Sequence, residues 1–300
     1  FYGNGMVFYL ICRNRRLRQT PSNMLLLNLS ACDFLTPLLS IPFDLVLEER
    51  GYLWPYGAFF CHVLWPASTL TATLSALTLS VISLDRFRLL MHPFTPRLTK
   101  TQIKFLIAGI HLLSLSIIVP YVVFLKLEDQ MCIEQWPKFW YRQVYTLVLF
   151  MTQYALPLFF MTTVYALALI KLYTLQAMPV RCRVKEENAS SRRSREVSLR
   201  SEQCSLQQRK SNSRLSSRVA YNVKQGCEIG FQCTCNQMFI AIVAIFAIFM
   251  LPNQVLWLWI DFGAGLHHEQ LNIVKIICWL FTYTNCVCNP VIFILSSKIS

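Results

Sequence analysis

Residues 22–47, SNMLLLNLSACDFLTPLLSIPFDLVL, form a long apolar stretch with only two charged side chains, Asp33 and Asp44. About twenty mostly apolar residues in a helix cross the hydrocarbon core of a bilayer, so this stretch predicts a transmembrane helix. Similar stretches follow at residues 59–84, 103–125, 140–173, 236–260 and 270–295. Residues 1–12 are also apolar, but at about 1.5 Å per residue they cover only about half of the core. We therefore expect a seventh helix that begins upstream of residue 1, and a cytoplasmic tail beyond residue 300.

The composition agrees with a membrane protein. Hydrophobic residues make up 55% of the chain and charged residues 14%, which would leave a soluble globular protein with too little polar surface. The predicted fold is all-α: a seven-transmembrane helix bundle over residues 1–300, truncated at both ends. Residues 174–235 are rich in Ser, Arg, Gln and Glu, and we expect a long disordered third cytoplasmic loop there. Serines beside basic residues in this loop are candidates for phosphorylation.

The net charge of +13 is concentrated in alternate loops. Besides the long loop, two of these loops carry basic residues at or near them: Arg13, Arg15, Arg16, Arg18, Arg86, Arg88, Arg97, Lys100 and Lys104. The positive-inside rule assigns these loops to the cytoplasm, which predicts a multi-pass protein of the plasma membrane with its amino terminus outside. The opposite loops are acidic, with Asp44, Glu48, Glu49, Glu128, Asp129, Glu134, Asp261 and Glu269. The basic charge therefore indicates membrane topology and no nucleic-acid partner.

Two cysteines are predicted on the outer side of the membrane. Cys61 lies at the outer mouth of the third helix, and Cys132 lies in the next outer loop. Because disulfides form in oxidising surroundings, we expect a disulfide between them.

Polar residues within predicted helices are costly in hydrocarbon and often mark function. Asp33 is the one carboxylate deep in a predicted helix, and Asn4, Ser75, Asn285 and Asn289 lie at a similar depth in other helices. A cluster of these five residues suits a small cation such as sodium. The alternative is a polar network that holds the helices together without an ion.

Residues 84–87, LDRF, end the third predicted helix. The carboxylate of Asp85 can hold the guanidinium of Arg86 in a resting position, and its release would free Arg86 for a partner. The alternative is an arginine at a helix end that pairs with its neighbour and extends toward water.

Seven groups of residues resemble the motifs of rhodopsin-like G-protein-coupled receptors, in order and spacing, over essentially the whole chain. They are Gly3-Asn4 with Val7; Asn28-Leu29-Ser30 with Asp33; Trp54-Pro55-Tyr56-Gly57 before Cys61; Asp85-Arg86-Phe87 with Pro93-Phe94; Pro157 with Tyr165; Phe246 with Pro252; and Asn289-Pro290-Val291-Ile292-Phe293. Each group is weak evidence alone, whereas the set is highly specific.

The resemblance implies a receptor without enzymatic activity. An outer ligand would shift two pre-existing conformations and move the sixth helix outward, so that Arg86 and the inner loops bind a heterotrimeric G protein. Arrestin and kinases would act on the 174–235 loop. The implied switch residues are Asp85, Arg86, Tyr165, Asn289, Pro290 and Phe293. No nucleophile, base and orienting partner share one predicted site, so an enzyme is excluded.

Three departures from the family leave the resting state of the switch open. Met250 stands where the sixth helix of these receptors usually has Trp, and Phe293 stands where the last motif usually has Tyr. Gln232 occupies the place of the acidic residue that would hold Arg86.

The resemblance also limits the ligand. Ser68 stands where amine receptors have Asp, and Tyr283 stands where opsins have the retinal-linking Lys. An outer rim with Asp44, Glu48, Glu49, Glu134 and Asp261, and with Trp54, Trp65, Trp136, Trp257 and Trp259, favours a short cationic peptide. The alternative for the carboxylates is ordinary solvated loop charge.

Two further similarities point to amidated neuropeptides. Asp261 matches the acidic position that neuropeptide FF and neuropeptide Y receptors use for an arginine of the peptide, and residues 252–255, PNQV, also resemble neuropeptide receptors. The expected ligand-binding residues are Asp44, Ser68, Glu134, Asn253, Gln254, Trp257, Asp261 and Tyr283.

Two other functions compete with a signalling receptor. A non-signalling scavenger or heteromer partner of the same fold would tolerate the altered switch residues. A seven-span transporter is less well supported, because the sequence has neither an internal repeat nor a second buried charge for a relay.

Overall fold

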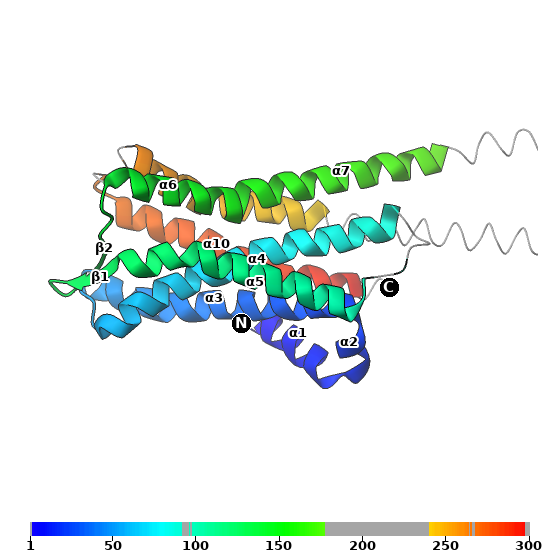
Figure 1. Cartoon of the computed structure of the whole chain (residues 1–300), viewed down its shortest axis with the longest axis horizontal. Helices are drawn as coiled ribbons and strands as arrows, with labels where there is room; N and C mark the ends of the chain where they lie inside the picture. The colour runs from blue at the N-terminus through cyan, green and yellow to red at the C-terminus, as the bar shows by residue number, and fades with distance from the viewer. Residues whose placement is uncertain are drawn as a thin grey trace, which may run out of the picture.

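The computed structural model describes residues 2–91, 96, 98–177, 240–263, 265 and 268–297. Within this part of the chain, six helices are long and apolar enough to cross a membrane. They span Pro21–Glu49, Gly57–Leu89, Lys100–Phe124, Phe139–Lys171, Ile240–Phe262 and Leu271–Ile292. Figure 1 shows them side by side along the long axis of the molecule. The six long stretches that the sequence predicts therefore correspond to helices.

The helices follow one another along the chain in a simple order. α1 (Tyr2–Arg13) and α2 (Arg15–Gln19) precede α3 (Pro21–Glu49) and α4 (Gly57–Met91). α5 (Lys100–Phe124), α6 (Phe139–Phe150), the π-helix η1 (Met151–Ala155) and α7 (Leu156–Ala177) come next. The Ile240–Phe262 helix and α10 (Leu271–Ser297) complete the bundle. α7 continues to Ala177, so the predicted loop starts later than residue 174, and residues 178–235 of it lie outside the described residues.

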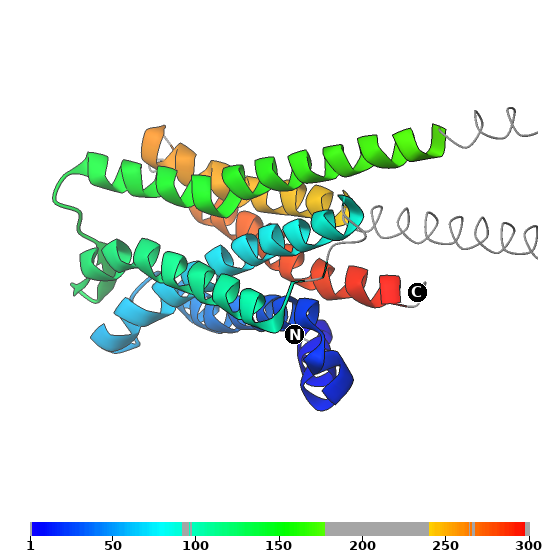
Figure 2. The ribbon, with the colours of Figure 1, turned by 45° about the vertical axis from the view of Figure 1, so that its right-hand side comes forward.

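α1 packs against the bundle at its amino-terminal end. Asn4 donates a hydrogen bond to the backbone oxygen of Cys286 in α10, with an N–O distance of 2.9 Å. A Cβ atom added to Gly3 would lie 3.0 Å from Cγ of Pro290, so glycine permits a close approach here. Figure 2 shows α1 and α2 diverging from the other helices beyond this contact. α1 is the short seventh helix.

α3 is longer at its carboxyl end than the charge pattern suggests. The helix predicted at residues 22–47 continues through Glu48 and Glu49, which the charge pattern assigns to a loop. Pro37 and Pro42 lie inside α3 without ending it. The helix ends where Gly51 adopts a φ of 61°, a left-handed conformation that glycine tolerates best and that commonly follows a helix.

A β-hairpin covers one end of the bundle. Its strands, β1 (Leu125–Glu128) and β2 (Met131–Glu134), are antiparallel, and the connecting Asp129 and Gln130 both have positive φ, 47° and 57°. Such a two-residue turn matches the twist of the strands. The sequence gives no strong strand signal over four-residue segments, and the hairpin was not predicted.

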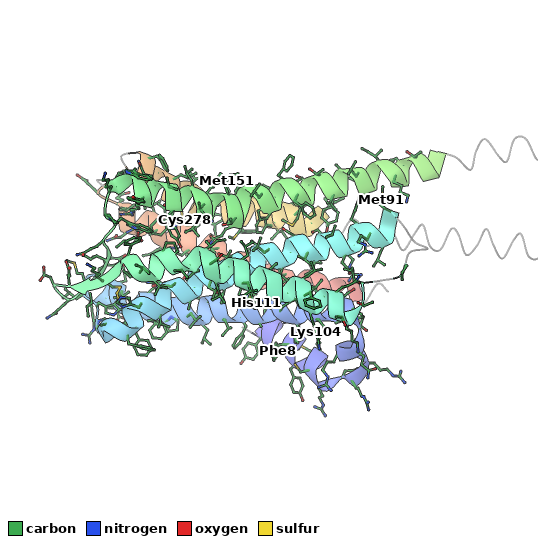
Figure 3. All side chains as sticks on the ribbon, in the orientation of Figure 1. Phe8, Met91, Lys104, His111, Met151 and Cys278 are labelled. Atoms are coloured by element: carbon green, nitrogen blue, oxygen red, sulfur yellow. A yellow bond between two sulfur atoms is a disulfide. The ribbon has the colours of Figure 1, made fainter. Side chains whose placement is uncertain are left out.

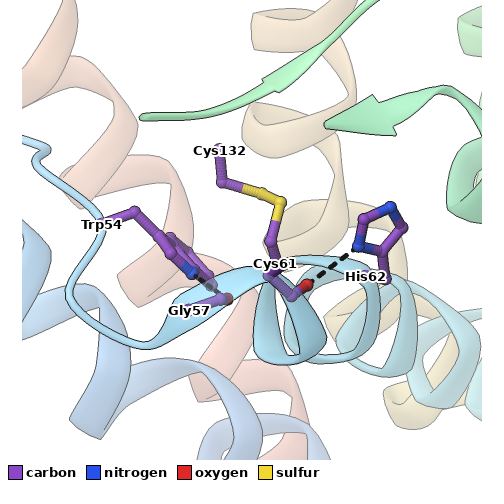
Figure 4. Close-up of a disulfide and its surroundings, with 6 residues drawn as sticks. Trp54, Gly57, Cys61, His62 and Cys132 are labelled. Carbon is purple, nitrogen blue, oxygen red and sulfur yellow. Dashed lines mark hydrogen bonds between the residues drawn. A yellow bond between two sulfur atoms is a disulfide. The ribbon is translucent and has the colours of Figure 1, made fainter. Parts of the chain in front are cut away.

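The hairpin is fastened to α4 by a disulfide between Cys61 and Cys132 (Figure 4). The predicted disulfide is confirmed. Both cysteines are buried with Trp54, whose ring nitrogen donates to the backbone oxygen of Gly57 at 2.9 Å. We call this side of the molecule the disulfide end.

The bundle buries apolar side chains between its helices, most of them in one large cluster, and exposes others around its outside. Phe246, Met161 and Leu79 are fully buried between helices. Exposed side chains such as Phe8 on α1 and Met151 on η1 lie on the outer surface (Figure 3). A soluble monomer rarely exposes such large apolar areas, whereas lipid tails accommodate them.

Candidate functional site

A cavity of about 280 Å³ opens between the helices at the disulfide end. Its walls come from α3, α4, α5, β2, α6, η1, the Ile240–Phe262 helix and α10. All eight residues that the sequence analysis assigns to ligand binding line this cavity: Asp44, Ser68, Glu134, Asn253, Gln254, Trp257, Asp261 and Tyr283. The fold therefore brings these eight residues from five elements to one cavity, whose size is near the lower end for small-molecule sites.

One wall of the cavity holds an internal ion pair. Nε of Arg142 lies 2.9 Å from Oδ1 of Asp261 and 3.8 Å from Oε2 of Glu134. The hydroxyl of Thr146 donates to Oδ2 of Asp261, and the side-chain amide of Gln143 donates to the Asp261 backbone oxygen at 2.9 Å. The Asp261 side chain is only 1% exposed. These contacts, which we call the Arg142 pair, join α6 to the Ile240–Phe262 helix.

The opposite wall holds a second carboxylate. Asp44 in α3 is half-buried, and the hydroxyl of Tyr283 in α10 lies 3.4 Å from its Oδ2. Nearby in the same cavity, the hydroxyls of Ser40 and Ser68 are hydrogen-bonded at 2.6 Å. Asp44 has no ion pair with any residue in the described part of the chain.

Amide side chains form the floor of the cavity. Gln153 in η1 donates to the hydroxyl of Thr73 in α4 at 2.9 Å. Gln254 in the Ile240–Phe262 helix donates in turn to the Gln153 side-chain oxygen at 3.3 Å. These bonds connect three helices directly above the core that contains Phe246 and Met250. π-Helical segments occur frequently at functional sites, and η1 turns Gln153 into this network.

Among the cavity residues that sequence reasoning missed, three have charged or amide side chains: Arg142, Gln153 and Lys275. Each lies inside a predicted transmembrane stretch, where a charged or amide side chain is a signal of function. That signal was applied to Asp33 but not to these residues. Without Arg142 and Lys275, the predicted rim carries more negative charge than the cavity does, because these two cations oppose the carboxylates.

The expected aromatic rim is corrected in part. Trp65 and Trp257 line the cavity, but Trp54 packs beside the disulfide. Trp136 packs on Phe124 and Tyr145, and Trp259 lies against His268. The acidic Glu48 and Glu49 are exposed and outside the cavity lining, since they follow Asp44 by one turn and more along α3.

The polar cluster around Asp33 lies deeper between the helices. Ser75 donates to Oδ1 of Asp33 at 2.6 Å, and Asn289 donates to Oδ2 at 2.8 Å. Asn4 instead donates to the backbone of Cys286. Asn285 lies one helical turn before Asn289 in α10, and the Oδ1 atoms of both are buried without a hydrogen-bond partner within the described residues.

The predicted switch residues lie toward the opposite end of the bundle. Asp85 is buried and accepts a hydrogen bond from Ser22 of α3 at 2.7 Å. The hydroxyl of Tyr165 donates to Ser83 at 3.0 Å, beside the half-buried Arg86. Asp85 therefore has a partner in another helix, which sequence adjacency to Arg86 does not reveal. Gln232 lies outside the described residues.

Comparisons with known proteins agree with this arrangement. A model of the family "7 transmembrane receptor (rhodopsin family)" matches residues 3–293. The RYamide receptor of Drosophila melanogaster is 30% identical over 182 residues, which cover 57% of this chain and 39% of that receptor. Neuropeptide FF receptor 2 of Mus musculus is 30% identical over 181 residues, 55% of this chain and 43% of that receptor.

Human neuropeptide FF receptor 1 is 28% identical over 312 residues, which cover 97% of this chain and 63% of that receptor. The chain thus spans less than two thirds of the length of these relatives. Because the family model matches almost every residue from one end to the other, this chain belongs to the rhodopsin family of seven-transmembrane receptors.

Proposed function

We propose that this chain is a receptor for a short, cationic, amidated neuropeptide and that it signals through heterotrimeric G proteins. The observation that carries the proposal is the convergence of eight expected ligand residues on one cavity at the disulfide end. As a member of its family the chain is a receptor and not an enzyme. The relatives support the ligand class, since they are named for neuropeptide FF and for RYamide, an amidated peptide by its name.

The charge of the cavity supports a cationic ligand. Three carboxylates line it, from Asp44, Glu134 and Asp261, against two cations, from Arg142 and Lys275. A low-dielectric cavity with one excess negative charge favours a ligand that brings a positive charge.

We also propose that the disulfide end faces the outside of the cell and that the other end faces the cytoplasm. The disulfide requires an oxidising compartment. Lys104 and the basic residues of α2 lie toward the opposite end (Figure 3), as the positive-inside rule requires. On that side, the loop at residues 174–235 is the proposed site for kinases and arrestin.

The test is a screen of amidated peptides on cells that express the full-length receptor, with ligand binding and nucleotide exchange on G proteins measured together. Arg86→Ala should lower peptide-evoked exchange about tenfold or more, as expected for losing a charge-assisted contact worth about 1.5–3 kcal/mol, with unchanged surface expression. Arg88→Ala, two residues further along α4, is the matched control and should retain most of the signal.

Each other outcome has a definite meaning. Binding without nucleotide exchange in the unmodified receptor would favour the scavenger function. Full signalling by Arg86→Ala would contradict the proposed switch. Uptake of the peptide into cells, measured as flux, would favour a transporter.

A further inference from the structure

The two carboxylate-bearing walls of the cavity differ in how their charge is balanced. Asp261 already has a cation at 2.9 Å, a hydroxyl donor from Thr146, and almost no exposed side-chain surface. A ligand cation could reach it only by displacing Arg142. Displacement would leave Arg142 with Glu134 alone, at 3.8 Å, and separating a buried ion pair is costly because both charges have been removed from water.

Asp44 has the opposite character. It is half-buried, lines the cavity, and has no ion pair within the described residues. Its hydrogen-bond donors are both neutral: the hydroxyl of Tyr283, at 3.4 Å, and the side chain of Trp65. A carboxylate withdrawn from water without a cation is unfavourable, so a cation that enters the cavity gains most at this wall.

Lys275 does not supply that cation. Its Nζ atom lies 5.9 Å from the centre of the Tyr52 ring, and the Tyr52 hydroxyl is bonded to Glu48 at 2.5 Å. The described contacts of Lys275 are therefore directed toward the Tyr52 and Glu48 side. Of the three cavity carboxylates, Asp44 is the one without an ion pair in the described part of the chain, since Arg142 contacts both Glu134 and Asp261.

We propose that Asp44, with the rings of Trp65, Trp279 and Tyr283, forms the subsite that binds the positively charged group of the ligand. All three rings line the same cavity as Asp44, and Trp65 and Tyr283 are hydrogen-bonded to its carboxyl group. A guanidinium is the group that best uses a carboxylate and aromatic faces together, because it is planar, makes two parallel hydrogen bonds and stacks on rings. The subsite therefore selects an arginine of the peptide.

This inference rests on the proposed function and moves the expected position of the ligand arginine from Asp261 to Asp44. The ligand arginine enters between α3, α4 and α10, while the Arg142 pair remains closed between α6 and the Ile240–Phe262 helix. The carboxylate that the sequence assigned to the ligand arginine, Asp261, then acts as a structural contact.

The experiment is a double-mutant cycle between receptor and peptide. The probes are synthetic peptides that end in Arg-Phe-amide and Arg-Tyr-amide, each paired with a copy in which citrulline, which is uncharged and of nearly the same shape, replaces the arginine. They are applied to the full-length receptor and to its Asp44→Asn, Asp44→Ser and Asp261→Asn variants. The measured quantity is the potency ratio between each arginine peptide and its citrulline copy, with surface expression measured on the same cells.

The unmodified receptor should prefer arginine over citrulline by about 30-fold or more, the fold-change expected when one partner of a desolvated charge pair is removed. Asp44→Asn should reduce this ratio to near one, and Asp261→Asn should leave it large even where absolute potency falls. Asp44→Ser repeats the test with a smaller side chain, in case Asp44→Asn does not reach the surface.

Three results would overturn the subsite. A large ratio in Asp44→Asn or Asp44→Ser, with a ratio near one in Asp261→Asn, would move the arginine to Asp261. Equal potency of arginine and citrulline peptides on the unmodified receptor would remove any cation subsite while leaving a peptide receptor intact. A receptor that neither binds nor responds to any probe would contradict the proposed function itself, and the subsite with it.

Discussion

The ion pair between Arg142 and Asp261 joins one partly exposed and one deeply buried side chain. Removing Arg142 and removing Asp261 should therefore lower the stability of the receptor by different amounts. Arg142→Gln leaves the Asp261 carboxylate, 1% exposed, without a cation, whereas Asp261→Asn leaves Arg142, 24% exposed, near Glu134. We expect Arg142→Gln to lower stability more, by about 1–3 kcal/mol, less than for a fully buried pair because water reaches Arg142.

The measurement is thermal unfolding of the purified receptor. The double variant Arg142→Gln, Asp261→Asn should recover part of the loss, because it leaves no buried charge unpaired. Arg50→Gln, at an exposed arginine after α3, is the control and should change the melting temperature little. Equal and additive losses from the two single variants would mean that the pair contributes no coupling.

The sequence predicts many of the residues that line the cavity, but it does not predict which of their side chains contact one another. Asp44 is predicted from the acidic charge of the outer side, whereas Asp261 and Tyr283 are predicted from the positions that they share with functional residues of similar receptors. The sequence does not reveal that Arg142 reaches Asp261, since 119 positions separate them and only the packing of α6 on the Ile240–Phe262 helix brings them together. The same holds for Ser22 and Asp85.

The contact between α1 and α10 depends on a missing side chain. A Cβ atom at Gly3 would lie 3.0 Å from Cγ of Pro290 and 3.3 Å from its Cβ. The proline ring is attached to the backbone at both ends, so it can move away only with the helix. Gly3→Val should therefore lower the melting temperature of the purified receptor, with a cost of about 1–3 kcal/mol as for overpacking.

Gly5 provides the matched control within the same helix. A Cβ atom there would lie 3.8 Å from the ring of Phe34, an ordinary contact. Gly5→Ala should leave stability unchanged or raise it by up to about 1 kcal/mol, because alanine favours a helix more than glycine does. If Gly3→Val unfolds at the same temperature as the unmodified receptor, the close approach is not limiting.

Helices were predictable here and their ends were not. Long apolar stretches identify helices because each must satisfy its backbone within the bilayer. The end of α3 depends on Gly51 and the following turn, and the β1–β2 hairpin depends on pairing between segments of four residues. Neither signal is strong in a single sequence.

Asp33 of α3 connects three helices of the bundle, because it accepts hydrogen bonds from Ser75 of α4 and Asn289 of α10. We propose that sodium binds there. A hard cation prefers oxygen ligands, which the carboxylate of Asp33 and the hydroxyl of Ser75 can supply. The buried side-chain oxygens of Asn285 and Asn289 lack hydrogen-bond partners within the described residues. A cation held between three helices would stabilise one arrangement of the bundle over another.

Sodium should therefore change the affinity of a peptide agonist, and Asp33→Asn should remove this effect. Radioligand binding across a series of sodium concentrations, with N-methylglucamine replacing sodium to keep ionic strength constant, measures it. A coupling of about 1–3 kcal/mol corresponds to about 5–150-fold in affinity. An equal sodium effect in both proteins would mean that Asp33 holds only a polar network.

The π-helix η1 directly precedes α7, the longer helix that follows it in the chain. α7 begins at its end and runs for 22 residues, about 33 Å at 1.5 Å per residue, to Ala177 beyond the neighbouring helices (Figure 1). A bend of about 10° at η1 would move the carboxyl-terminal end of α7 by about 6 Å. Gln153 in η1 lines the cavity, so we expect a small change of backbone angle beside the cavity to produce a much larger displacement at the far end of α7.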